Sequence, residues 1–265
     1  MKCNIYKFLI RFLALVLSCV LLAGCSQGAG GGNDFDPPQS NQPTSSNKKR
    51  VAITYDDGPH NVRTKKIVDE LAKYGYNATF FVVGNRVASV GENDLTYNGA
   101  EALKYAASKG NEIGIHGYTH NAYYNTCSNS TYRSEIENTR AAINKVIPGY
   151  KVTLMRPIGG AITEERVEDS DYAVIMWSVD SGDWKHKATT DAETTKENID
   201  TIVNNVMSKV SDGSIILMHD LYENTYEATK IILKELHDQG YDVVTVSELL
   251  GSTLSAGKKF SSYKQ

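Results

Sequence analysis

The sequence predicts an α/β domain built around a parallel sheet or barrel. Between residues 49 and 251, short apolar runs alternate with amphipathic helical patterns, and no linker-like segment interrupts these roughly 200 residues. A helix between two strands carries the chain back across the sheet, so alternation of this kind produces parallel strands. Polar residues follow five of the apolar runs, and in such folds the chemistry gathers at the carboxyl ends of the strands.

Seven apolar runs are the candidate strands. Each run is short and is bounded by polar or turn-forming residues, as expected of buried strands. They comprise residues 51–55, 78–83, 112–115, 152–155, 173–177, 214–218 and 242–246.

Five segments between these runs have helical spacing. Their apolar residues recur every three or four positions, and most of them stop at Gly or at Pro-Gly. They span residues 64–74, 99–109, 132–147, 199–210 and 225–239.

The composition limits the class of partner. The chain has 265 residues, of which 41% are hydrophobic and 22% charged, as in soluble globular proteins. The net charge is −3, the isoelectric point is near 6.1, and the predicted domain has no basic cluster. We therefore expect no nucleic-acid partner.

Residues 1–24 are predicted to be a lipoprotein signal peptide. Lys2, Lys7 and Arg11 precede an apolar stretch that is shorter than a comfortable bilayer span. The stretch ends in Leu-Ala-Gly followed by Cys25, which resembles the bacterial lipobox, so cleavage before Cys25 would leave that cysteine to carry the lipid. The alternative is an ordinary secretory signal. Two or more acyl chains on Cys25 would give stable anchoring.

Residues 25–48 are predicted to be a flexible tether that follows the lipidated cysteine. They are rich in Gly, Ser, Asn, Gln and Pro, a composition that cannot bury a core. Such a coil reaches about 25 Å, which would hold an extracytoplasmic domain close to the bacterial membrane. The domain spans residues 49–251, and a polar C-terminal tail spans residues 252–265.

Five polar groups follow five of the predicted strands. Helix and turn capping would explain Ser, Asn or Gly at these points, but it does not explain three of the chain's six histidines. We therefore predict a catalytic site at this edge of the sheet. The groups are Asp56-Asp57, residues 116–120, Arg156-Pro157, residues 180–184, and His219-Asp220.

The histidine spacing indicates a metal site. His116 and His120 are four residues apart, and together with one carboxylate they would leave a coordination position open, as in catalytic zinc sites. Zinc lowers the pKa of a bound water from about 15.7 to about 7. An iron site with two histidines and one carboxylate is the alternative. The adjacent acids Asp56 and Asp57 favour hydrolysis, because hydrolysis needs a base beside the water.

The chain resembles the polysaccharide deacetylases with a NodB-homology domain, carbohydrate esterase family 4, over nearly all of residues 49–251. The resemblance implies a distorted (β/α) barrel of about seven parallel strands. It also implies metal-dependent removal of N-acetyl groups from a cell-surface glycan. The five family motifs match residues 54–58, 116–120, 156–160, 180–184 and 217–219, and residues 77–84 resemble the family's second strand.

The resemblance also implies a role for each motif residue. Asp57, His116 and His120 would bind Zn²⁺, or another divalent metal such as Co²⁺. Asp56 would be the general base, held in place by Arg156. His219 would be the general acid, and Asp183 would orient it. Leu217 and Trp184 would form the wall of the substrate site. The backbone N–H of Gly159 would donate a hydrogen bond to the oxyanion.

The chain departs from the family pattern in three places. Gly117 stands where Ser or Thr is usual, so the loop loses a side-chain hydrogen bond. Ile115 stands where Asn is common, and Ile158-Gly159 replaces a usual Pro-Tyr. Because none of these changes touches the implied ligands, base or acid, we expect an active enzyme.

The predicted function is that of a hydrolase acting on non-peptide carbon–nitrogen bonds, with N-acetylglucosamine or N-acetylmuramic acid of peptidoglycan as the substrate. The alternative substrates are other acetylated glycans: chitin oligomers, xylan O-acetyl esters or an exopolysaccharide. The alternative class of protein is a non-catalytic glycan-binding lipoprotein that keeps the fold. The expected partners are the glycan and the membrane, through the lipid anchor, and we expect a monomer.

Overall fold

The structure is a computed structural model that describes residues 48–88 and 99–263. The predicted signal peptide, Cys25 and all but the last residue of the predicted tether lie outside the described residues and stay predictions. Within the described part of the chain, no helix is both long and apolar enough to cross a membrane.

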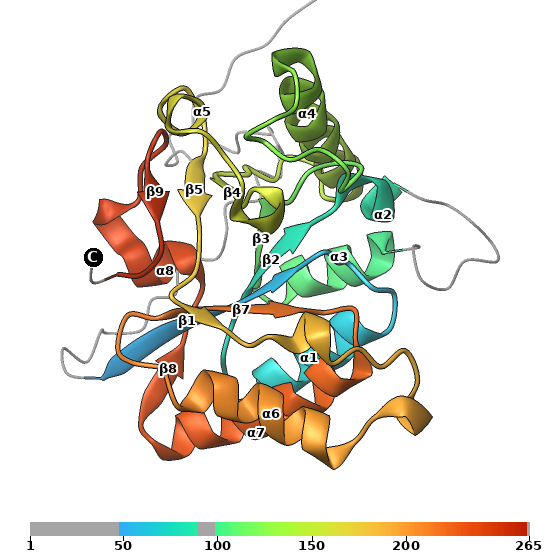
Figure 1. The fold of residues 1–265 in the computed structure, drawn as a ribbon, viewed down its shortest axis with the longest axis vertical. Coiled ribbons are helices and arrows are strands. Elements are labelled where there is room, and N and C mark those ends of the chain that lie inside the picture. The colour runs from blue at the N-terminus through green and yellow to red at the C-terminus, as the bar shows by residue number, and fades with distance from the viewer. Residues whose placement is uncertain (1–47, 89–98, 264–265) are drawn as a thin grey trace, which may run out of the picture. The chain divides into compact units, whose positions relative to one another are not determined.

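The described strands form one parallel sheet, in the order β6-β7-β1-β2-β3-β4-β5-β9, with β8 paired to the start of β1. The sheet curls into a half-barrel with helices around it, so the predicted distorted barrel is confirmed (Figure 1). The strands are β1 (Lys49–Asp56), β2 (Thr79–Val82), β3 (Glu112–Ile115), β4 (Leu154–Met155), β5 (Ala173–Ile175), β6 (Val179–Asp180), β7 (Ile215–His219), β8 (Tyr241–Val243) and β9 (Lys259–Phe260).

The strand count exceeds the prediction of about seven, because β6 and β9 were not expected. Each has only two residues and, unlike the equally short β4, was not marked by a separate apolar run. β9 lies within the predicted C-terminal tail and pairs with β5, which places Phe260 against Ile175. The tail thus contributes a strand to the edge of the sheet.

All five predicted helices are present, and the described residues form three further helices of five residues each. The longest begins three residues earlier than predicted, because Ser128 caps its first turn by accepting a hydrogen bond from the Thr131 N–H. The helices are α1 (Arg63–Lys73), α2 (Gly84–Ala88), α3 (Ala100–Ser108), α4 (Asn129–Val146), α5 (Glu164–Glu168), α6 (Lys196–Met207), α7 (Glu223–Asp238) and α8 (Val246–Leu250). Short 3₁₀ turns are η1 (Ile158–Gly160), η2 (Asp183–Lys185), η3 (Asp191–Glu193) and η4 (Gly251–Thr253).

The core lies on both faces of the central strand. Val51 and Ile53 of β1 pack into the main hydrophobic cluster, whereas Ala52 between them packs into a second cluster on the other face. A parallel strand that is buried on both faces has a continuous run of apolar residues, and residues 51–55 of β1 form such a run.

The register of the strands positions the functional residues. Asp56 at the end of β1 pairs with His219 at the end of β7, and Asp180 of β6 pairs with Leu217. On the other side of β1, Ile115 at the end of β3 pairs with Met155 of β4. Because every pairing is parallel, the polar residues that follow these strands meet at one edge of the sheet.

Candidate active site

The turn after β1 holds the two adjacent acids. Asp57 has a left-handed backbone with φ of 72°, which is uncommon for a residue other than glycine. The Arg86 guanidinium donates a hydrogen bond to the Asp57 carbonyl. A Cβ on Gly58 would lie 2.2 Å from Oδ1 of Asp220, so only glycine allows this close approach. The turn is therefore held in one conformation from both sides.

The loop after β3 carries the two histidines. His120 has φ of 61°, so a second residue of the site occupies the left-handed region. Nδ1 of the buried His116 ring donates to the Arg156 carbonyl at 2.9 Å, which leaves Nε2 to face the acids. An outer hydrogen bond of this kind fixes the ring orientation that a metal ligand needs.

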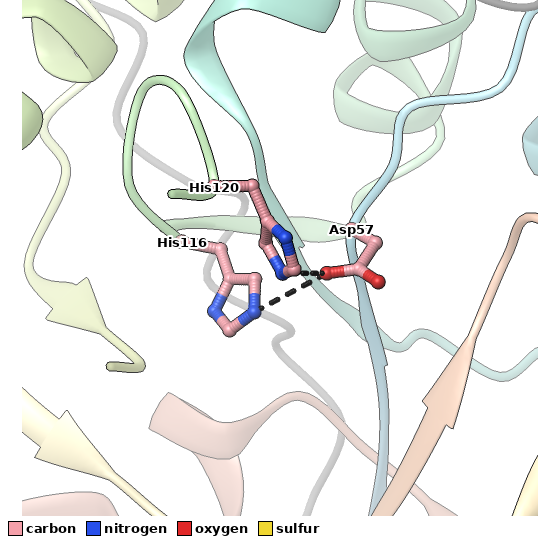
Figure 2. Close-up of side chains that lie close together, drawn as sticks. All are labelled: Asp57, His116 and His120. Atoms are coloured by element: carbon pink, nitrogen blue, oxygen red, sulfur yellow. Dashed lines mark ion pairs between the residues drawn. The ribbon is translucent and has the colours of Figure 1, made fainter. Parts of the chain in front are cut away.

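The three predicted ligands converge (Figure 2). Oδ1 of Asp57 lies 2.8 Å from Nε2 of His120 and 3.4 Å from Nε2 of His116. One ligand atom from each residue lies within 4.8 Å of the others, which is close enough for all three to share one ion. The structure therefore places these side chains together, as the metal hypothesis requires.

The donor atoms also suit a divalent cation. Oδ1 of Asp57 is buried and has no hydrogen bond of normal geometry, although both rings are near it. Burial by itself would raise the pKa of Asp57, but the interactions with His116 and His120 outweigh this and hold the pKa well below its usual range. Two imidazoles and one ionised carboxylate, with one buried oxygen left unsatisfied, fit zinc or a similar ion.

Arg156 fixes the second acid. Its fully buried guanidinium donates from Nη1 to Oδ1 of Asp56 at 2.8 Å and to Oγ1 of Thr54 at 2.7 Å. Nε and Nη2 donate to the carbonyls of Ile175 and Met176. Burial lowers the pKa of Arg156, and the charge of Asp56 opposes that change. Asp56 is thus oriented, with Oδ2 3.7 Å from Nε2 of His116.

His219 is paired with Asp183. Nδ1 of His219 lies 2.7 Å from Oδ1 of Asp183, whose Oδ2 accepts from the His219 N–H and from the Thr225 hydroxyl, each at 2.7 Å. Burial would lower the pKa of His219, but the interactions with Asp183 outweigh it and raise the pKa to about 9. The imidazole is therefore protonated at neutral pH and can donate a proton.

The predicted substrate residues lie at the same edge of the sheet, one in strand β7 and two in short 3₁₀ turns. Leu217 is buried in β7, Gly159 has φ of 59° in η1, and Trp184 is 44% exposed in η2. Within residues 48–88 and 99–263, no hydrogen bond or ion pair joins Gly159 or Trp184 to the three predicted ligands. A cavity of about 430 Å³ between α4 and α5 contains none of the predicted site residues.

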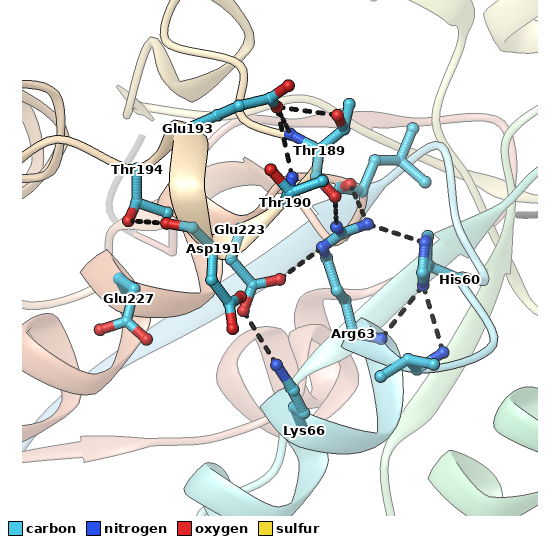
Figure 3. A network of polar contacts seen from close by, with 12 residues as sticks. His60, Arg63, Lys66, Thr189, Thr190, Asp191, Glu193, Thr194, Glu223 and Glu227 are labelled. Carbon is cyan, nitrogen blue, oxygen red and sulfur yellow. Dashed lines mark hydrogen bonds and ion pairs between the residues drawn. The ribbon is translucent and has the colours of Figure 1, made fainter.

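A polar network holds the loop that follows η2 (Figure 3). Arg63 of α1 donates to Oε2 of Glu223 at 2.7 Å and to the carbonyl of Thr189 in that loop. Burial and the charge of Arg63 lower the pKa of His60 to about 4, so its neutral ring accepts from backbone N–H groups through Nδ1. The network ties α1 and α7 to the segment that extends from Asp183 and Trp184.

Sequence reasoning missed three residues around the site. Thr225 supports Asp183, Asp220 packs against Gly58, and Glu135 of α4 contacts the histidine loop. Asp220 was recognised only as a neighbour of His219, and the other two lie on helices where a buried polar residue leaves no periodic pattern. Their partners are distant in sequence, so only the tertiary structure identifies them.

Comparison with known proteins gives the family. The profile of the polysaccharide deacetylase family matches residues 44–174. The chain is 38% identical over 203 residues to the peptidoglycan-N-acetylmuramic acid deacetylase PdaC of Bacillus subtilis, which covers 77% of this chain and 39% of that protein. It is 30% identical over 218 residues to the peptidoglycan-N-acetylglucosamine deacetylase PgdA of Listeria monocytogenes, covering 82% of this chain and 42% of that one. The chain spans about two fifths of the length of these two curated relatives.

Solved structures agree with this assignment. The structure of PdaC from Bacillus subtilis superposes with a TM-score of 0.66 and 38% identity, covering 77% of this chain and 90% of that chain. A family 4 acetyl xylan esterase from Clostridium thermocellum, solved with a cobalt ion, superposes with a TM-score of 0.68 and 30% identity over 82% of this chain and 100% of its own. Sequence and fold thus agree over the same catalytic architecture, and the chain belongs to the polysaccharide deacetylase family.

Proposed function

We propose that this protein is a metal-dependent hydrolase that removes N-acetyl groups from N-acetylglucosamine or N-acetylmuramic acid in peptidoglycan. The observation that carries the proposal is the convergence of Asp57, His116 and His120 beside the oriented carboxylate of Asp56. The names of the relatives PdaC and PgdA support peptidoglycan as the substrate.

Asp57, His116 and His120 would hold the metal, which we propose to be Zn²⁺, with Co²⁺ as the alternative. A divalent cation held by these residues would supply Lewis acidity and would lower the pKa of a bound water molecule. The cobalt ion named in the structure of the Clostridium thermocellum esterase supports a divalent metal in this family.

The protein groups then have separate tasks. Asp56 accepts a proton from the attacking water, and Arg156 holds the Asp56 carboxylate in position. Attack of the water oxygen on the acetyl carbon gives a tetrahedral oxyanion, which the Gly159 N–H would stabilise. The imidazolium of His219 gives its proton to the amide nitrogen as the carbon–nitrogen bond breaks. The products are acetate and a free amine on the sugar.

The decisive experiment measures acetate released from purified peptidoglycan by the full-length protein, with and without a chelator. We expect the chelator to abolish release and added Zn²⁺ or Co²⁺ to restore it. Release that persists after complete metal removal, as checked by elemental analysis, would contradict the metal-dependent mechanism. The Asp56→Asn variant serves as the control for contaminating activity.

The similarity to the acetyl xylan esterase favours one second candidate, an O-acetyl esterase or deacetylase of another glycan. Parallel assays on acetylated xylan, chitin oligomers and peptidoglycan separate these substrates by their relative kcat/KM. A non-catalytic lipoprotein would instead bind glycan without any turnover when metal is added. The intact set of Asp56, Asp57, His116, His120 and His219 argues for turnover.

We also propose that the protein acts outside the cytoplasm as a monomer anchored by lipid on Cys25. The lipobox-like sequence before Cys25 and the Gly- and Ser-rich tether support this location. We expect the wild-type protein in the membrane fraction and a Cys25→Ala variant to lose lipid labelling. Wild-type protein that incorporates no labelled acyl chain would contradict the anchor.

A further inference from the structure

A buried carboxylate lies against the loop that carries the two histidines. Glu135 of α4 is only 6% exposed, and its Oε2 accepts hydrogen bonds from the N–H groups of Tyr118 at 2.6 Å and Thr119 at 2.8 Å. Its Oε1 accepts from the Thr119 hydroxyl at 2.7 Å. One side chain thus binds both residues at the centre of the His116–His120 segment.

This segment needs such a restraint. Gly117 has φ of 80° and His120 has φ of 61°, so the loop enters the left-handed region twice within four residues. For a residue such as His120 that conformation is strained and persists only when the surroundings enforce it. The three hydrogen bonds to Glu135 act on the residues between these two positions.

The packing around Gly117 shows how closely the Glu135 carboxylate approaches the loop backbone. A Cβ on Gly117 would lie 3.1 Å from Oε2 of Glu135, 3.1 Å from Cδ1 of Ile158 and 3.2 Å from the Tyr124 hydroxyl. A Ser or Thr at this position would therefore crowd Glu135 as well as strain the backbone. Glu135 supplies hydrogen bonds to the loop that residue 117, as glycine, cannot supply.

A buried tyrosine, Tyr124, also packs beside Gly117 and Glu135. The Tyr124 side chain is fully buried, and its hydroxyl has no hydrogen-bond partner among the described residues. Its ring packs edge-on against Tyr132 of α4, with centroids 5.0 Å apart. The buried Glu135 and Tyr124 side chains thus pack together beneath the loop, whereas Thr119 lies exposed on its outer side.

We infer that Glu135 is a positioning residue that holds the His116–His120 loop in the conformation that binds the metal. This inference rests on the metal site proposed above and deepens it. Glu135 bonds to the loop backbone and to Thr119, and it acts on the ligands only through the loop. Removing it should leave all three ligands in the chain but weaken their joint affinity for the ion.

The test measures Zn²⁺ affinity of the full-length protein by competition with a chromogenic chelator. We expect Glu135→Ala to weaken binding by about 10- to 100-fold, the usual effect of losing an outer partner of a metal site. We expect Glu135→Gln to bind within about threefold of wild type, because its carbonyl can accept both N–H groups while its amide donates to the Thr119 hydroxyl. Glu137→Ala is the matched control, since Glu137 is exposed on the same helix and should leave affinity unchanged.

A second readout uses the metal-free protein. In Glu135→Ala, the amides of Tyr118 and Thr119 should exchange with deuterium faster than in wild type, whereas the amides of β3 should not. If Glu135→Ala folds too poorly for titration, Thr119→Val removes one of the three hydrogen bonds and should weaken Zn²⁺ binding by a smaller factor.

The outcomes separate the two proposals. If Glu135→Ala melts at a lower temperature but binds Zn²⁺ like wild type, Glu135 supports only the packing of α4 and the inference is wrong. If Glu135→Gln loses as much affinity as Glu135→Ala, the charge and not the hydrogen bonding is responsible, and the positioning role is overturned. If wild type itself binds no divalent metal, the metal site fails together with the inference, whatever the variants do.

Discussion

Arg156 and Asp56 form a buried ion pair, with Nη1 of the arginine 2.8 Å from Oδ1 of the aspartate. The arginine side chain is fully buried, and the aspartate side chain is almost so. The remaining donors of the guanidinium bind Thr54 and two backbone carbonyls, so every hydrogen bond serves to aim one carboxylate oxygen. The Asp56 carboxylate is thereby fixed beside His116 before any substrate binds.

Replacing Arg156 should separate orientation from charge. A lysine keeps the charge but cannot reproduce the planar set of donors, so we expect Arg156→Lys to lower kcat by at least about 100-fold. Arg156→Met leaves Asp56 buried without its partner, and we expect a loss of about 3–5 kcal/mol in the free energy of unfolding. Acetate release and urea denaturation measure the two effects. Wild-type kcat in Arg156→Lys would show that Asp56 needs no such orientation.

Asp56→Asn should remove catalysis without removing the metal. Asn has nearly the same shape and can still accept from Arg156, but it cannot take a proton from water. We expect kcat to fall by about 10²- to 10⁴-fold, the usual contribution of a general base. Zn²⁺ affinity should change by less than about tenfold, because Asp57, His116 and His120 remain. A variant that turns over normally would assign the base to another group.

The pair of His219 and Asp183 predicts an alkaline limit to activity. The folded-state pKa of His219 is raised to about 9, so the imidazole that we propose as the general acid is protonated at neutral pH and loses its proton as the pH passes 9. We expect kcat/KM to decrease on the alkaline side of its pH profile. In Asp183→Asn, this decrease in kcat/KM should begin at a lower pH. The pair also stabilises the fold: its contribution is complete below the unfolded pKa of about 6.5 and disappears as the pH rises through about 9.

Measuring kcat/KM from pH 5 to 10 in wild type and Asp183→Asn checks this prediction. Thr225→Val offers a milder control, because it removes one hydrogen bond to Asp183 and leaves the contact with His219 in place. An unchanged alkaline limb in Asp183→Asn would mean that His219 is not the group that titrates.

Asp220 should make the fold less stable as the pH rises. Burial raises the pKa of Asp220 to about 7, so the folded protein holds this proton more tightly than the unfolded chain does. Stability therefore falls as the pH rises from about 4 to about 7 and stays lower above that range. We expect Asp220→Asn to be more stable than wild type by about 1–3 kcal/mol at pH 8, with a smaller gain or none at pH 5.

Urea denaturation at pH 5 and pH 8 measures the difference, on protein treated with chelator. Asp171→Asn is the matched control, because Asp171 is exposed and its substitution should not change the pH dependence. Equal effects of Asp220→Asn at both pH values would show that Asp220 keeps its charge in the folded state.

Seven of the nine described strands, five of the eight described helices and the polar residues at the strand ends could be predicted from local sequence alone. β1, β3 and β7 were predicted because an apolar run and the turn that ends it are local features, readable without knowing the fold. The acids after β1 and the histidines after β3 stood out for the same reason. The family motifs then assigned a role to each of them, and the structure places Asp57, His116 and His120 within reach of one ion.

How these residues are held depends on contacts that form only in the folded chain. The pairing of Asp56 with His219, the four acceptors around Arg156 and the contact of Glu135 with the histidine loop all join segments far apart in the chain. Strands of two residues, such as β6 and β9, exist only because a neighbouring strand offers them hydrogen bonds. Local propensity depends on residues that are near in the sequence, whereas strand register and buried polar contacts depend on packing between residues that are far apart in it.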